Sequence, residues 1–469
     1  MMKNAGDFAD SFIEFEKENA LFGQKLEGVF FWKLVRSRVY NNILKARGIL
    51  GAGSFTVAEG LGGKARDFMR YCAAALINVL KPYPRADVVV VTHPRKVTVN
   101  GKKVDVNTAW LIDRLREQKA RYLVLDVPLN WGTHPMQIDK NTRKIENFTI
   151  IPKVFHKYFI RNYLRRPEKL KELSARLTER FGHDGNIVKE AHDQIKIFKI
   201  DYKYYSRLLK KIGPKKIWLV IGYGNHALIA AAKDQGIETE EIQHGLMSRH
   251  HMNYSFGGLK DIPYFPDRIC LFGSFWYDIS NLPLTEDRVD YYNNPIVGYE
   301  RGGIRNPKNK KLLFLTQPII TRYIEKLVTE MMENRFFDEY EIAVKLHPAE
   351  YRVWKRESPG LAGLTERGVR IIDNSDVPLY DLFREYDTVV AVASTALFEA
   401  LYFGCDVYLL SVPSIRWIDS LAGECFPSPI RTVDDLVNLL TMEERNNIDI
   451  GEVFYDGDVA VDTEVTKKG

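Results

Sequence analysis

Short runs of apolar residues alternate with amphipathic stretches along most of the chain. Four runs rich in Val, Ile and Leu each predict a buried strand, namely ADVVVVTHPR (86–95), RYLVLDVPL (121–129), KKIWLVIGYG (215–224) and DRICLFGS (267–274). TAWLIDRLREQ, between the first two runs, has the apolar spacing of a helix. Strands that alternate with helices predict a parallel sheet with helices on both faces.

A second series of strands and helices follows in the C-terminal part of the chain. Its predicted strands are KKLLFLTQP (310–318), YEIAVKLHP (340–348), GVRIID (368–373), DTVVAVAS (387–394) and CDVYLLS (405–411). VPLYDLFREY predicts a helix with Pro378 close to its first turn. The segment VGYERGGIRNPKNKK (297–311) combines glycines, a proline and charges, and predicts a hinge. We therefore expect an α/β protein with two Rossmann-like domains, residues 86–300 and 301–469, that face each other across a cleft.

The remaining segments favour helices. Residues 1–85 predict an N-terminal helical segment, and residues 155–212 predict a helical insertion in the first Rossmann-like domain. GVFFWKLVRSRVYNNILKARG (28–48) mixes aromatic and basic residues, a pattern that can lie on an anionic membrane. One amphipathic pattern is weak evidence, so packing on its own domain with a solvated basic face is the favoured interpretation.

Composition narrows the class of protein. The chain has 469 residues, of which 45% are hydrophobic and 27% charged, as in ordinary globular proteins. A net charge of +6 is too small at this length to indicate a dedicated nucleic-acid binder. The 4 cysteines are scattered without a CxxC pair, which argues against a disulfide framework and fits a reducing compartment. With no apolar signal core and no membrane-spanning run, we expect a cytoplasmic protein.

The first candidate site is the His-Pro pair in EIAVKLHPAEY (341–351). Pro348 has no N–H, so the chain leaves the sheet at His347. This puts the imidazole, with Lys345 close by, at the carboxyl end of a strand, where α/β proteins bind ligands. The alternative is a core histidine without a ligand role.

The second candidate site is AVASTALFEALYFG (391–404), where a strand is expected to end at Ala393 or Ser394. Ser394 and Thr395 then lie near the N-cap of a helix, where hydroxyls and free N–H groups can bind a phosphate. Glu399 lies a little more than one turn later and can reach a ribose or sugar hydroxyl. The alternative is an ordinary cap with a solvated Glu399.

In the first half of the chain, polar residues follow three predicted strands. This placement predicts a polar cleft wall that binds an acceptor, with one histidine as the general base. The polar residues are Arg95 and Asp105 in THPRKVTVNGKKVD, Asn225 and His226 in GYGNHALIAAAK, and Gln243, His244, Gly245 and Arg249 in EIQHGLMSRHHMNY. The spacing matches no HExxH motif and no cysteine is nearby, so we expect no metal and no cofactor.

Three short motifs carry a resemblance to a known family. The HP of KLHPAE, the ST of ASTALFEA and the QHG of EIQHGLMS together resemble bacterial capsule and lipopolysaccharide glycosyltransferases of GT-B fold. The likeness is to the Kdo transferases of capsule assembly and to the sialyltransferases with HP and SS/ST motifs, over roughly residues 215–412. Teichoic-acid CDP-glycerol glycerophosphotransferases are similar at the HP and serine motifs.

The resemblance implies a nucleotide-sugar donor, with a CMP sugar as a candidate, held by the C-terminal domain. His347 would then contact the donor phosphate and stabilise the departing nucleotide, and Ser394 and Thr395 would bind that phosphate. The sialyltransferases also carry an acidic D/E-D/E-G motif that supplies the base, and this chain has none. The base therefore stays open among His244, His226 and Asp105.

The expected function is a metal-independent inverting glycosyltransferase of bacterial cell-surface polysaccharide synthesis. A histidine and a helix N-terminus aimed at the leaving phosphate would stabilise charge where it develops. The acceptor would be a glycan or lipid-linked glycan, reached from the cytoplasm with peripheral association at the inner membrane. The alternatives are a CDP-glycerol-type phosphotransferase, a nucleotide-sugar epimerase, and a catalytically silent glycan-binding or scaffold protein.

Overall fold

The structure, a computed structural model, describes residues 5–49, 83–94, 96–99, 102–127, 140–145, 168–292, 309–318, 320–392, 394–412, 425–442 and 446–455. The chain forms two compact units. The smaller unit comprises Met1–Ser11, Leu44–Val57 and Glu300–Val453, and the larger unit comprises Phe12–Ile43, Ala58–Tyr299 and Phe454–Gly469.

The larger unit contains, in its described part, a parallel sheet of seven strands in the order β5-β4-β1-β6-β7-β8-β9. The strands are β1 (Val88–Val91), β4 (Tyr122–Asp126), β5 (Thr142–Lys144), β6 (Lys216–Val220), β7 (Glu238–Ile242), β8 (Arg268–Leu271) and β9 (Val289–Tyr291). The chain runs from β1 outward to β5, and then returns to place β6 on the other side of β1. The strand order therefore reverses between β1 and β6.

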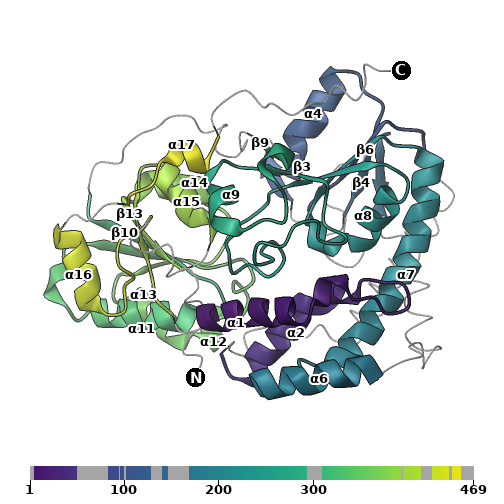
Figure 1. Ribbon diagram of the computed structural model, residues 1–469. Coiled ribbons are helices and arrows are strands. Elements are labelled where there is room, and N and C mark those ends of the chain that lie inside the picture. The colour runs from purple at the N-terminus through teal and green to yellow at the C-terminus, as the bar shows by residue number, and fades with distance from the viewer. Residues whose placement is uncertain are drawn as a thin grey trace. The chain divides into compact units, whose positions relative to one another are not determined.

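Helices of the larger unit bury one face of this sheet. The helix α7 (Ile187–Ile212) packs on α8 (His226–Lys233), whose run of alanines favours helix (Figure 1). Their apolar side chains, such as Leu209 and Leu228, form one core with Val89 and Val91 of β1. Gly213 ends α7 with φ 69°, the left-handed conformation that glycine adopts without strain. The unit also contains α4 (Ala109–Glu117), α6 (Glu168–Phe181) and α9 (Phe275–Ser280).

Two N-terminal helices contribute residues to the larger unit. They are α1 (Ala5–Glu18) and α2 (Phe31–Ala46), and residues 12–43 belong to this unit. Arg36 is 1% exposed and pairs with the buried Glu16 at 2.5 Å. It also donates to the carbonyls of Met252 and Ser255. The expected solvated basic face is thus partly wrong, because Arg36 and Lys33 of α2 point into the core.

The smaller unit contains, among the described residues, a parallel sheet of five strands in the order β12-β11-β10-β13-β14. The strands are β10 (Lys311–Leu315), β11 (Glu341–Lys345), β12 (Arg370–Ile372), β13 (Thr388–Ala391) and β14 (Asp406–Leu409). Here the strand order reverses between β10 and β13, which pair with each other. The two predicted α/β units are confirmed.

Helices cover both faces of the smaller sheet. Figure 1 shows α11 (Thr321–Met331) and α13 (Pro359–Glu366) along one face, with α14 (Leu379–Glu385) and α15 (Thr395–Tyr402) on the other. The described residues of this unit also form the helices α12 (Trp354–Glu357), α16 (Val433–Met442) and α17 (Ile450–Val453). No helix among the described residues has an apolar stretch long enough to cross a bilayer.

Candidate functional site

In an open parallel sheet, ligands bind beyond the carboxyl ends of the strands at the point where the strand order reverses. The larger unit has such a point between β1 and β6, and the smaller unit has one between β10 and β13. A His-Pro pair follows a strand at or next to each of these points. His93 and Pro94 follow β1, and His347 and Pro348 follow β11, the neighbour of β10.

At the reversal in the larger unit, side chains from three strand ends meet. His93 follows β1, Tyr223 follows β6, and His244 follows β7. The rings of His93 and His244 lie 5.4 Å apart between centroids and are tilted by 30°. The hydroxyl of Tyr223 lies 3.5 Å from Nε2 of His244. His244, which the sequence motif singled out, therefore lies in a cluster of side chains. Tyr223 was not among the predicted residues.

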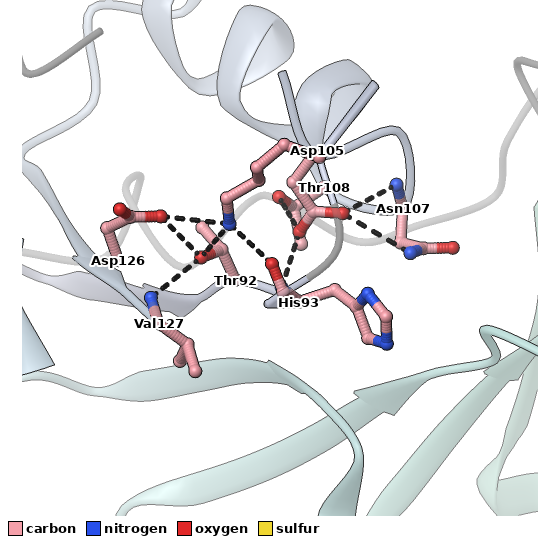
Figure 2. A network of polar contacts seen from close by, with 8 residues as sticks. Thr92, His93, Asp105, Asn107, Thr108, Asp126 and Val127 are labelled. Atoms are coloured by element: carbon pink, nitrogen blue, oxygen red, sulfur yellow. Dashed lines mark hydrogen bonds and ion pairs between the residues drawn. The ribbon is translucent and has the colours of Figure 1, made fainter. Parts of the chain in front are cut away.

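The loop that carries His93 is anchored by buried charges (Figure 2). The ammonium of Lys96 pairs with Asp126 at 2.9 Å and donates to Oγ1 of Thr92 at 2.7 Å. Asp105, which is 1% exposed, accepts from the backbone N–H of His93 at 2.7 Å and from Oγ1 of Thr108 at 2.8 Å. The carboxylate of Asp105 thus holds the loop, whereas the imidazole of His93 projects away from the network (Figure 2).

Three histidines of the larger unit, His244, His251 and His226, are neutral at physiological pH. Burial, with smaller contributions from His93 and His251, lowers the pKa of His244 to about 3. Burial also lowers the pKa of His251 to about 4, with Arg36 and Lys33 adding to the effect. His226, at the start of α8, has a pKa well below its usual range, chiefly because of burial and secondarily because of Lys33. A neutral imidazole can accept a hydrogen bond from a hydroxyl, but a pKa of about 3 makes His244 a weak base.

Beneath these rings lies an acid that the sequence analysis did not select. Glu241 of β7 is fully buried and accepts a hydrogen bond from the hydroxyl of Tyr254 at 2.7 Å. Burial raises the pKa of Glu241 to about 7. Its neighbour Glu240 points to the other face of the sheet and pairs with Lys216 at 2.7 Å. Two adjacent buried glutamates in one strand are unusual, and EE before QHG was the signal available in the sequence.

The other residues that were expected in this cleft wall differ in burial and in their hydrogen bonds. Gln243 is buried. Its amide nitrogen donates to the carbonyl of Gly245 at 3.0 Å, and its amide oxygen accepts from the N–H of Phe272 at 2.8 Å. The side chain therefore joins the loop after β7 to the residue that follows β8. Asn225 donates to the carbonyl of Ile221 at 3.0 Å. Arg249 is exposed, and Arg95 lies outside the described residues.

In the smaller unit, a buried carboxylate shapes the turn at His347. Glu350 is 2% exposed and accepts from the N–H of His347 at 3.0 Å and from Oγ1 of Thr316 at 2.5 Å. The hydroxyl of Thr321, the first residue of α11, also donates to it. Glu350 therefore ties the ends of β10 and β11 to one helix, and leaves the imidazole of His347 exposed. Sequence analysis did not find this role.

On the other side of β10, the chain leaves β13 at Ala391, earlier than expected, and α15 begins at Thr395. Ser394 is the N-cap, and its hydroxyl oxygen accepts from the N–H of Ala396 at 3.2 Å. Thr395 and Glu399 are half-buried. The cap geometry expected for Ser394 is present.

Two further residues predicted near the donor flank His347: Lys345 is the last residue of β11, and Pro348 follows His347 in the turn. Lys345 donates to the hydroxyl of Tyr351 at 2.7 Å and to the carbonyl of Asn374, so its ammonium is held within the unit. Pro348 is exposed. Within the described residues, no group of three His, Cys, Asp or Glu side chains is placed to hold a metal ion.

No family model matches the chain, and no curated protein matches it. Among solved structures, a UDP-GlcNAc 2-epimerase from Methanocaldococcus jannaschii in complex with UDP-GlcNAc and UDP has a TM-score of 0.46 and 12% identity, over 79% of this chain and 95% of that chain. MurG from Acinetobacter baumannii has a TM-score of 0.40 and 10% identity, over 76% of this chain and 90% of that chain. Similarity at this level assigns no activity. The class of protein is an α/β protein with two Rossmann-like units.

Proposed function

We propose that this chain is an enzyme acting on a nucleotide sugar, and more specifically a metal-independent inverting glycosyltransferase. The observation that carries the proposal is the placement of two phosphate-binding features around the end of β10. His347 follows β11 on one side of β10, and the N-terminus of α15 with Ser394 and Thr395 follows β13 on the other. A donor phosphate at this reversal point would meet an imidazole and the positive end of a helix.

The chemistry follows from these groups. As the glycosidic bond to the leaving nucleotide breaks, negative charge grows on the departing phosphate, and preorganised donors would stabilise it there. Ser394 can still donate its hydroxyl proton while its oxygen caps the helix. The acceptor would be a glycan or lipid-linked glycan of a cell-surface polysaccharide, at the inner face of the membrane.

The test is nucleotide binding by the purified protein. Melting temperature is measured with CMP, CDP, UDP, GDP and their sugars, and a ligand at 100 times its Kd should stabilise by about 2.7 kcal/mol. We expect one nucleotide family to raise it. His347→Ala should weaken the shift, while His192→Ala, on α7 of the larger unit, should leave it unchanged.

Ser394→Asp is the sharper variant. Aspartate is as good an N-cap as serine, so the helix should remain capped, while the new charge repels a phosphate. We expect unchanged stability of the free protein together with loss of the nucleotide shift. Absence of a shift with every nucleotide, or a shift that Ser394→Asp leaves intact, would refute the donor site. Interconversion of a nucleotide sugar without any acceptor would indicate an epimerase instead.

A further inference from the structure

Glu241 is a buried carboxylate that forms no ion pair within 4 Å among the described residues, and such a group normally costs stability. Its Oε2 lies against the backbone of Gly222, the first residue of the turn η3 (Gly222–Gly224), which follows β6 after Ile221. A Cβ built on Gly222 would stand 2.2 Å from that oxygen, so only glycine allows this approach. Its Oε1 accepts from the hydroxyl of Tyr254 at 2.7 Å.

These two contacts hold Tyr223 from two directions. Gly222 is the residue before Tyr223, so Oε2 of the carboxylate packs closely against the backbone there, without a hydrogen bond to the described residues. The ring of Tyr254 packs edge-on against the ring of Tyr223, with centroids 5.7 Å apart and planes at 81°. One carboxylate thus supports both the main chain and the side chain of Tyr223.

Tyr223 in turn contacts His244. Its phenol oxygen lies 3.5 Å from Nε2, and burial raises the pKa of Tyr223 to about 12, so the phenol is neutral. Nδ1 of His244 is buried and has no hydrogen-bond partner among the described residues. In the tautomer with its proton on Nε2, the imidazole donates to the phenol oxygen and Nδ1 keeps its lone pair. This tautomer is favoured because a buried acceptor without a partner is more readily tolerated than a buried N–H without one.

We propose that Glu241 is a positioning residue for His244. It fixes Tyr223 through its contacts with Gly222 and Tyr254, and Tyr223 holds the imidazole in the tautomer that carries its proton on Nε2. Glu241 itself touches no substrate. The inference concerns the tautomer of His244 and does not depend on the proposed function.

The experiment is ring-nitrogen NMR of the full-length protein with ¹⁵N-labelled histidine and no substrate. For His244 we expect a protonated Nε2 and an unprotonated Nδ1. In Glu241→Ala and in Tyr254→Phe, the ring-nitrogen signals of His244 should instead show an average of both tautomers. Glu241→Gln, which keeps an oxygen for the Tyr254 hydroxyl, should restore the single tautomer.

A double-mutant cycle separates positioning from general loosening of the fold. Tyr223→Phe should reproduce the change in the His244 signals, and adding Glu241→Ala should then have no further effect. The proposal is overturned if Glu241→Ala leaves the His244 signals unchanged, or if its effect is equally large in the Tyr223→Phe background. If Glu241→Ala does not fold, Tyr254→Phe tests the same link. Because no ligand is used, the outcome is independent of whether nucleotides bind.

Discussion

Replacing Lys33 by methionine should stabilise the larger unit in acid. Lys33 is 5% exposed, and its ammonium lies over the rings of Phe256 and Phe265, with 4.3 Å and 5.3 Å to the centroids. Burial, with a further contribution from Arg36, lowers the pKa of Lys33 from 10.5 to about 7. Methionine has a similar length, is unbranched and carries no charge, so it can fill the same space.

The size and sign of the effect follow from this pKa. A fall from 10.5 to about 7 on folding corresponds to about 5 kcal/mol at 1.36 kcal/mol per pH unit. Below pH 7, Lys33 is charged in both states and the folded chain bears the whole cost. Between pH 7 and 10.5 only the unfolded chain holds the proton, so the cost shrinks, and above 10.5 it vanishes. Allowing for relaxation around the charge, we expect Lys33→Met to gain about 3–5 kcal/mol at pH 5.5.

The charged and titratable groups that act on Lys33 or respond to it are Arg36 on the same helix, Glu16 on α1, Glu241 on β7, and His226 and His251. Stability should be followed by urea-dependent hydrogen exchange of peptides from β6 and β7, because a chain of two units need not unfold in one transition. Lys45→Met, at an exposed position of α2, is the matched control and should change little. A gain that does not decline between pH 5.5 and 10, or no gain at pH 5.5, would refute the reasoning.

Two further changes test the strand-end loops. Glu350→Ala removes the acceptor of three hydrogen bonds, each of which contributes about 1.5–3 kcal/mol before water replaces part of it. We therefore expect the free energy of unfolding of the smaller unit to fall by about 3–5 kcal/mol. The amide of His347 should also exchange faster. Unchanged protection of that amide would contradict the role of Glu350. Gly222→Ala should displace Glu241 and lower the melting temperature, and a Gly222→Ala/Glu241→Ala double variant should recover part of the loss.

Strands and their ends are predictable from the sequence where the signal is local. Alternation of apolar runs and amphipathic stretches predicted both sheets, because burial on both faces requires nearly continuous apolar residues in the strands. Pro348 predicted the exit of the chain after β11, since a missing N–H is a property of one residue. The cap at Ser394 was predictable for the same reason, although the strand before it ends earlier than expected.

Charged residues gave misleading local signals. Lys33 and Arg36 look like a solvated helix face, and ETEEI of β7 looks polar, yet four of its five residues are buried. Whether such a side chain faces water or the core depends on a partner far along the chain, such as Met252 for Arg36 or Tyr254 for Glu241. Hydrophobic pattern carries no information about that partner.

By itself, then, the sequence determined the fold class and which residues stand at strand ends, because those properties follow from periodicity and from the backbone chemistry of single residues. Only the tertiary structure decided which strand ends are neighbours. The return of the chain from β5 to β6 brings the ends of β1, β6 and β7 together, and with them His93, Tyr223 and His244. Strand order is set by packing across the whole sheet, and so the site is a property of the assembled core.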